Sequence, residues 1–380
     1  MKFTHFILAA GALAIPMAGN AQEHLKSLDP TGIDKTTPAS EDFFTHVNKG
    51  WMESHPLTPE HARYGQFNIL SDSSDNRVRR IVTNLAKTNP KPGTNAYKVA
   101  ALYETAMDSV RRNQLGAEPI KPLLKKIEET TPDKMEDLFI WMHTNYSSPL
   151  TSAGPQEDLA NSHRYAMYIG GPGLSLGDRD YYLLNDKRNK DVREAYKKLI
   201  VSQMRNAGYS KKDAERIMKN VMKVETLIAD STWTREQSRN IPAMYNPRTI
   251  AQVKDMYPNL PWDRIFIETM GIQTPDTIIV TNINTAKQGD NLYASLTDRE
   301  KKDLYLWDIV SSAAPFLSDT FSDTAFEFNK VMSGVQQQRP RWKRALGATE
   351  GYLGEAIGQL YVEEYFPASS KEYMIGLVEN

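Results

Sequence analysis

Residues 340–367 read PRWKRALGATEGYLGEAIGQLYVEEYFP, a stretch that predicts one long helix carrying four glycines. Gly347, Gly351, Gly354 and Gly358 are spaced four, three and four residues apart, so they share one face of that helix. Each glycine weakens a helix by ~1 kcal/mol relative to alanine. Close approach of a neighbouring backbone would offset that cost, and we predict that the glycine face packs tightly against another helix. The alternative is a loosely wound helix with two breaks.

The opposite flank of the same helix is apolar, and its large residues are Trp342, Leu346, Leu353, Ile357 and Leu360. Burial on both faces would place the helix inside a domain. Soon afterwards, a capping box at residues 369–372 begins a short helix whose apolar side chains need a covering surface. We therefore expect the sequence to stop within a larger fold, truncated at its C-terminal end.

The composition predicts a soluble globular protein of about two domains, with 380 residues, 40% hydrophobic and 24% charged. Lys plus Arg number 46 and Asp plus Glu number 47, so no net positive field favours nucleic acid as a partner. The chain has no cysteine, which excludes disulfides and attachment of a lipid through cysteine.

The N-terminus has the pattern of a secretory signal peptide over residues 1–21. Lys2 precedes an apolar run from Phe6 to Ala18, and small residues follow up to Ala21. The run is too short to span a bilayer, so we expect no transmembrane anchor after cleavage. Export without cysteines is typical of a periplasmic or secreted bacterial protein.

Beyond a polar, flexible lead-in over residues 22–40, the periodicity predicts a mainly α fold from residue 41 to 380, with at most a small β element. Ser40 is placed to cap the first helix. Further helices are expected at 69–88, 94–113, from 131, 210–233, from 246, and from 297, where Thr297 and Glu300 form a capping box. Short strands are expected at 164–169 and 277–281.

Three segments together resemble the neprilysin and endothelin-converting-enzyme family of zinc metallopeptidases. They are EDFFTHVNKGWMESHPLTPEHARYGQFNIL at 41–70, GPGLSLGDRDYYL at 171–183, and PRWKRALGATEGYLGEAIGQLYVEEYFPASSK at 340–371. The resemblance implies the family's amino-terminal helical half, which restricts entry to short peptides, the substrate class of the family. It also implies that the thermolysin-like catalytic half follows in a full-length protein.

The catalytic chemistry of that family needs two histidines at positions i and i+4 of a helix, with a glutamate beside the first. No histidine pair in this chain is four residues apart; the histidines are 5, 24, 46, 55, 61, 143 and 163. We therefore expect no metal ligand and no catalytic residue here. Zinc is expected only in a full-length homologue, so whether the chain alone is an enzyme stays open.

The resemblance implies a role for Arg63, which matches a family arginine that docks the carboxylate end of the substrate. A planar guanidinium suits that role because it pairs two oxygens at once. The alternative is an ordinary structural salt bridge. A second basic residue of some relatives is replaced here by Ser71.

Two other charged groups are interpreted as structural. Asp178 and Asp180 lie in a predicted turn, where their charges pair locally or cap the next helix. A basic run of Arg339, Arg341, Lys343 and Arg344 lies at a predicted helix start. The helix dipole disfavours cations there, so we expect nearby acidic groups to compensate them.

The leading hypothesis is a substrate-restricting helical region of a neprilysin-like peptidase, inactive without its catalytic half. One alternative is an exported, non-catalytic helical protein that binds peptides through Arg63. Another is a structural partner that completes a separately encoded catalytic subunit.

Overall fold

A computed structural model describes residues 32–273, 275 and 277–379 of the chain. The chain divides into two compact units between Thr58 and Pro59. The predicted signal peptide at 1–21, and the lead-in up to residue 31, lie outside the described residues.

The first unit contains helix α1 (Phe43–Ser54). The prediction that Ser40 caps this helix is wrong, because the side chain of Asp42 accepts a hydrogen bond from the Thr45 amide at 2.9 Å. The preceding residues are tied to α1, since the Asp34 amide donates to the His46 carbonyl at 2.7 Å and Lys49 pairs with the Asp34 carboxylate at 3.1 Å.

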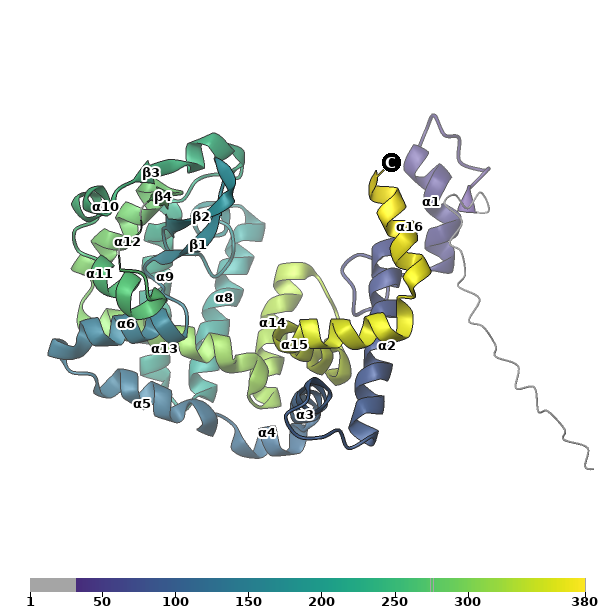
Figure 1. Ribbon diagram of the computed structural model, residues 1–380, viewed down its shortest axis with the longest axis horizontal. Helices are drawn as coiled ribbons and strands as arrows, with labels where there is room; N and C mark the ends of the chain where they lie inside the picture. Colours follow the sequence, from purple (N-terminus) through teal and green to yellow (C-terminus); the bar gives the residue numbers. More distant parts are fainter. Residues whose placement is uncertain (1–31, 274, 276, 380) are drawn as a thin grey trace, which may run out of the picture. The chain divides into compact units, whose positions relative to one another are not determined.

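The second unit is mainly helical with one small sheet, which confirms the predicted fold class (Figure 1). Its α-helices are α2 (Gln66–Lys87), α3 (Asn95–Met107), α4 (Ser109–Leu115), α5 (Lys121–Glu129), α6 (Met135–Asn145), α7 (Asp180–Leu183), α8 (Lys187–Asn206), α9 (Lys211–Ser231), α10 (Ile250–Met256), α11 (Trp262–Arg264), α12 (Ile283–Ser295), α13 (Asp298–Ala313), α14 (Asp319–Ser333), α15 (Arg341–Tyr365) and α16 (Ala368–Glu379). Its strands are β1 (Ser152–Asp158), β2 (Asn161–Gly170), β3 (Asn246–Arg248) and β4 (Ile278–Val280).

Capping side chains set several of the helix starts. Thr297 and Glu300 form the predicted reciprocal capping box of α13, and Ser210 caps α9 by accepting a hydrogen bond from the Asp213 amide. The prediction of a helix start at residue 246 is wrong. Residues 246–248 form β3, and α10 begins only after a capping box at Thr249.

The sheet has the strand order β1-β2-β4-β3. The two predicted strands are confirmed as β2 and β4, which pair in parallel with Met167 opposite Ile278. Strands β1 and β3 pair antiparallel on the outer edges. They contain Pro155 and Pro247, residues that edge strands tolerate because a missing amide there costs no internal ladder bond.

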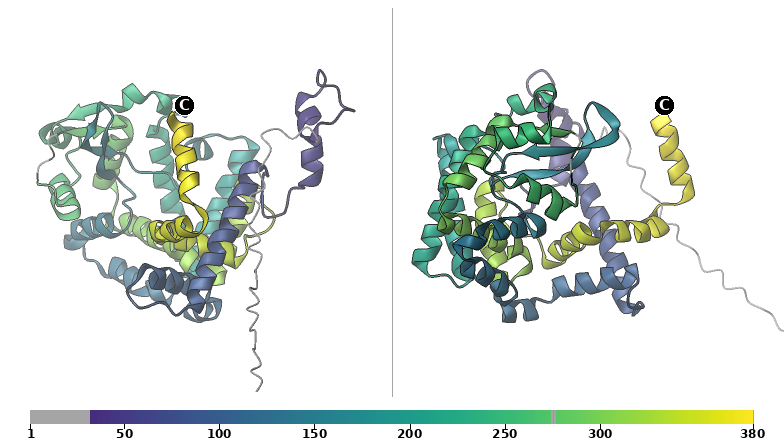
Figure 2. Two further views of the ribbon diagram at one scale, coloured as in Figure 1. Left: turned by 45° about the vertical axis from the view of Figure 1, so that its right-hand side comes forward. Right: turned by 60° about the vertical axis from the view of Figure 1, so that its left-hand side comes forward.

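Most of the core lies among α8, α9, α12, α13 and the inner strands. A smaller core joins α2, α3 and α15, helices that pack together in the views of Figure 2. Leu346 and Ile357 of α15 are buried there against Val82 and Val99. The predicted apolar flank of α15 therefore faces a core.

The prediction that the glycine face of α15 packs tightly is wrong. A Cβ atom built on Gly347, Gly351, Gly354 or Gly358 meets no atom within 4 Å in the described part of the chain. The helix departs from helical geometry at Leu353, where φ is −129° and ψ is 26°. Thus α15 is buried on one flank only, and its glycines face open space.

Helix α16 turns sharply away from the end of α15 (Figure 2). Within the described residues of α16 no side chain is buried. Its exposed large apolar residues are Tyr373, Met374, Ile375, Leu377 and Val378. Exposed apolar groups in such a row mark an interaction surface.

Among the described residues, every helix is too short or too polar to cross a membrane.

Candidate functional site

The segment that precedes α2 is anchored on both sides of Arg63. The Pro59 carbonyl accepts hydrogen bonds from the Gln336 and Gln337 amides, both at 2.9 Å. On the other side of the segment, α2 begins at residue 66, with Gly65 as its N-terminal cap residue. The backbone around Arg63 is therefore held on one side by residues 336–337, which are distant in the sequence, and is continuous on the other side with helix α2.

A cluster of charges secures the same segment to the start of α15. Lys343 pairs with the Asp72 carboxylate at 2.6 Å and with the Glu60 carboxylate at 3.8 Å. His61 lies 3.9 Å from the other oxygen of Asp72. Because the Lys343 side chain is only 11% exposed, this ion pair is better shielded from water than a surface pair.

The Arg63 side chain is exposed and makes no hydrogen bond or ion pair with any residue that the structure describes. The structural salt bridge weighed as an alternative is therefore not formed among these residues. A guanidinium without a partner keeps all five N–H donors available for a ligand. Its fork geometry suits a carboxylate.

Two apolar residues close to Arg63 are unusually exposed. Phe67 is 88% exposed and Leu70 is 50% exposed, and they are three residues apart on α2. Ser71, the position without a second basic residue, is also exposed. The sequence held no signal for this exposure, because apolar residues at helical spacing more often face a core.

The prediction of a turn is confirmed for Asp178, whereas the predicted local pairing or helix capping by its charge is not formed. The Asp178 carboxylate accepts a hydrogen bond from the Asp180 amide at 2.9 Å, and Asp180 is the first residue of α7. The other oxygen of Asp178 pairs with Arg235.

Along the sequence, the exposed Arg63 is followed within seven residues by the exposed apolar side chains of Phe67 and Leu70. The chain belongs to peptidase family M13, whose sequence model matches residues 39–380.

Curated relatives support this membership. The chain is 28% identical over 361 residues to rat endothelin-converting enzyme 1, an alignment that covers 91% of this chain and 46% of the relative. It is 25% identical over 367 residues to neprilysin-1 of Caenorhabditis elegans, covering 89% of this chain and 48% of the relative. The chain spans about half the length of the curated relatives it matches.

Solved structures agree on the fold. The inhibitor complex of the zinc metalloprotease Zmp1 of Mycobacterium tuberculosis superposes with a TM-score of 0.83 at 24% identity, covering 93% of this chain and 53% of that one. The open state of the same enzyme gives a TM-score of 0.74 at 25% identity, covering 90% and 53%. These likenesses establish the fold of the present chain.

The described residues offer no group that fits the zinc of such enzymes. Among the described residues, no three His, Cys, Asp or Glu side chains are grouped so that they could hold a metal ion. His143 is largely buried, and this burial lowers its pKa; its Nε2 has no hydrogen-bond partner in the described part of the chain. Zinc sites need three or four converging ligands, so a single histidine does not make one.

Proposed function

We propose that this chain is the amino-terminal, substrate-restricting helical region of an M13 zinc metalloendopeptidase that acts on short peptides. The observation that carries the proposal is the setting of Arg63, which is exposed, unpaired among the described residues and fixed on an anchored backbone. In the proposed role, Arg63 pairs with the carboxylate end of a peptide, and Phe67 and Leu70 contact its apolar side chains.

The catalytic groups belong, in this proposal, to a further region of the full-length protein, since the chain spans only 46% of the length of rat endothelin-converting enzyme 1. The exposed apolar residues of α16 support such an association, because they need a covering surface. Alone, the chain is proposed to be inactive, and zinc is proposed only for the full-length protein. The N-terminal pattern supports export to the periplasm or outside the cell.

A fluorogenic peptide assay of the purified chain with added zinc tests the proposed inactivity. We expect no turnover, because the chain lacks the paired histidines and glutamate that activate a zinc-bound water. Turnover that a chelator abolishes would overturn this part of the proposal.

Peptide binding tests the proposed role of Arg63. A short peptide with a free carboxylate end should bind at least ~10-fold more weakly to Arg63→Gln, since a charge-assisted bidentate pair is lost. The amidated peptide should bind the chain and this variant alike. Arg239→Gln, a matched change at another exposed arginine, should leave binding unchanged. Equal affinities for Arg63→Gln and the unaltered chain would refute the role.

The alternative function is a non-catalytic peptide-binding protein. One observation favours it, namely the extensive buried core that the second unit forms among the described residues. Both functions allow peptide binding by the chain alone. The alternative predicts that joining a catalytic half leaves the peptide affinity unchanged, whereas the leading proposal predicts tighter binding when the two halves are joined.

A further inference from the structure

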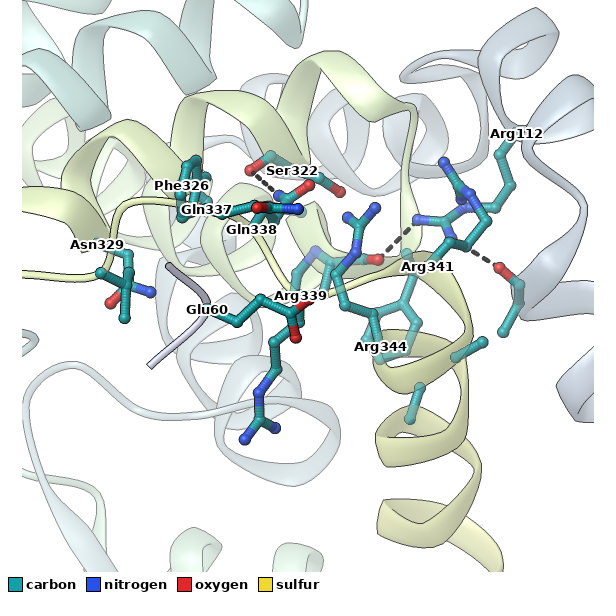
Figure 3. A pocket seen from close by; sticks show the side chains of 18 of the residues that line it. Glu60, Arg112, Ser322, Phe326, Asn329, Gln337, Gln338, Arg339, Arg341 and Arg344 are labelled. Carbon is teal, nitrogen blue, oxygen red and sulfur yellow. Dashed lines mark hydrogen bonds between the residues drawn. The ribbon is translucent and has the colours of Figure 1, made fainter. Parts of the chain in front are cut away.

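A cavity of about 660 Å³ lies between α3, α4, α14 and the start of α15 (Figure 3). Its volume falls within the range of sites for small organic ligands, ~300–1,000 Å³. Much of its lining is apolar, and the larger apolar residues are Leu102, Pro315, Phe316, Phe326 and Val335. An apolar ligand body would therefore be desolvated there.

Positively charged side chains outnumber negatively charged ones in the lining of the cavity. Four arginines line the cavity, namely Arg112, Arg339, Arg341 and Arg344, against one carboxylate, that of Glu60. Glu60 in turn lies 3.8 Å from the Lys343 ammonium, so its charge is shared with a further cation. The cavity therefore carries an excess of positive charge.

Two of these arginines are satisfied by the protein. The guanidinium of Arg112 donates to three backbone carbonyls, those of Ala106, Pro315 and Leu317, at 2.7–3.1 Å. Arg341 pairs with the carboxylate of Asp319. The expectation that acidic groups compensate the basic run thus holds for Arg341 and for Lys343.

Among the partly buried arginines of the cavity, Arg344 is the exception. Its Nε atom is buried and has no hydrogen-bond partner, and its guanidinium has no ion pair in the described part of the chain. Burial, followed by repulsion from Arg341, lowers the pKa of Arg344, while Asp319 and Asp323 act in the opposite direction. A partly buried cation without a partner is costly to the fold, and an anion bound beside it would relieve that cost.

We propose that this cavity binds a small organic acid whose carboxylate pairs with Arg344 and whose apolar body contacts the apolar lining. One carboxylate matches the site, because Arg344 is the partly buried arginine without a partner. Arg341 pairs with Asp319, Arg112 donates its N–H groups to backbone carbonyls, and Arg339 is exposed to water. Arg63 is not among the lining residues, so this proposal is independent of the peptide-binding role above.

Calorimetric titration of the full 380-residue chain with 3-phenylpropionate, 3-phenylpropanamide and inorganic phosphate tests the proposal. We expect the acid to bind with a Kd of about 1 mM or lower, and the neutral amide and the phosphate to bind at least ~10-fold more weakly. The acid and the amide differ only in the charged group, so this comparison needs no substitution. A tripeptide ending in phenylalanine distinguishes a peptide terminus from a free acid as the natural source of the carboxylate.

Substitutions then locate the site. Arg344→Gln should weaken acid binding at least ~10-fold, and Ala348→Phe, which fills the cavity, should abolish it; circular dichroism checks that both variants are folded. Arg239→Gln and Arg63→Gln should bind the acid as the unaltered chain does. No binding of the acid, equal binding of the amide or of phosphate, or undiminished binding to a folded Arg344→Gln would each overturn the proposal.

Discussion

The phenolic hydroxyl of Tyr182 donates a hydrogen bond of 2.7 Å to the carboxylate of Glu225 inside the larger core. The same carboxylate accepts hydrogen bonds from the Ser175 hydroxyl and, at 3.1 Å, from the Tyr196 hydroxyl. The Trp307 indole donates to Tyr196 at 3.1 Å. The network joins the segment before α7 to α8, α9 and α13, so a buried acid holds helices together through neutral donors.

Replacing Tyr182 with Phe should destabilise the chain by about 1–3 kcal/mol. The change removes a buried donor to Glu225 and a buried acceptor of the Leu176 amide, and unsatisfied buried polar groups cost that much. Urea unfolding followed by circular dichroism measures the change. The matched control is Tyr181→Phe, because Tyr181 is only partly buried and its hydroxyl has no hydrogen bond among the described residues. Equal losses in both variants would contradict the role of the network.

Glu225 should make stability fall as pH rises. Burial raises its pKa above the ordinary value, so between the unfolded pKa, ~4.3, and the folded pKa, the folded chain binds more protons than the unfolded chain. The free energy of unfolding therefore decreases across that window.

The Glu225→Gln variant isolates this effect, because every other titrating group is shared with the unaltered chain. We expect the stability of the unaltered chain, relative to that variant, to decline from pH 4 to pH 7 in urea unfolding. If the stability difference between the two proteins stays constant or grows with pH, the three hydroxyl donors lower the pKa of Glu225 at least as much as burial raises it.

Asp303 is fully buried and joins α13 to α9. Its carboxylate accepts hydrogen bonds from Arg216 at 3.1 Å, from Asn220 at 2.6 Å and from Arg299 at 2.6 Å. Asp303→Asn should lower the free energy of unfolding by about 2–3 kcal/mol. The loss is smaller than for breaking a fully buried ion pair, because water reaches about a third of each arginine side chain. Asp230→Asn, at an exposed position of α9, should change thermal stability by less than ~0.5 kcal/mol. A comparable loss in the two variants would argue against this ion-pair cluster.

The sequence predicted those features that depend on a few neighbouring residues. Thr297 and Glu300 form their capping box because both partners lie within one turn of helix. Strand β1 was missed, since its sequence SAGPQED has no apolar alternation and its place is fixed by pairing with β2. Likewise, no local pattern distinguishes exposed Phe67 from buried Phe139.

For the candidate sites, the sequence supplied the residue types and the fold supplied their partners. Arg63 was identified through a family resemblance, whereas its exposed, unpaired state depends on the packing around the segment. Arg341 and Arg344 belong to the same basic run, yet only Arg341 meets an acidic partner, Asp319 of α14. That contact joins residues of different helices, and the periodicity of one helix cannot predict it.

The glycine face of α15 yields a matched pair of substitutions with opposite expected signs. Gly358→Ala should raise the free energy of unfolding by about 0.5–1 kcal/mol, because its Cβ would meet no atom within 4 Å and alanine favours the helix. Gly289→Ala in α12 makes the same chemical change, but its Cβ would lie 2.1 Å from the Leu150 carbonyl oxygen and 3.0 Å from Pro172. The free energy of unfolding of that variant should fall by more than ~1 kcal/mol, since the backbone must move to admit the new atom. Urea unfolding of both variants measures the two changes in the free energy of unfolding. A decrease for Gly358→Ala would show that the glycine face of the purified chain is covered.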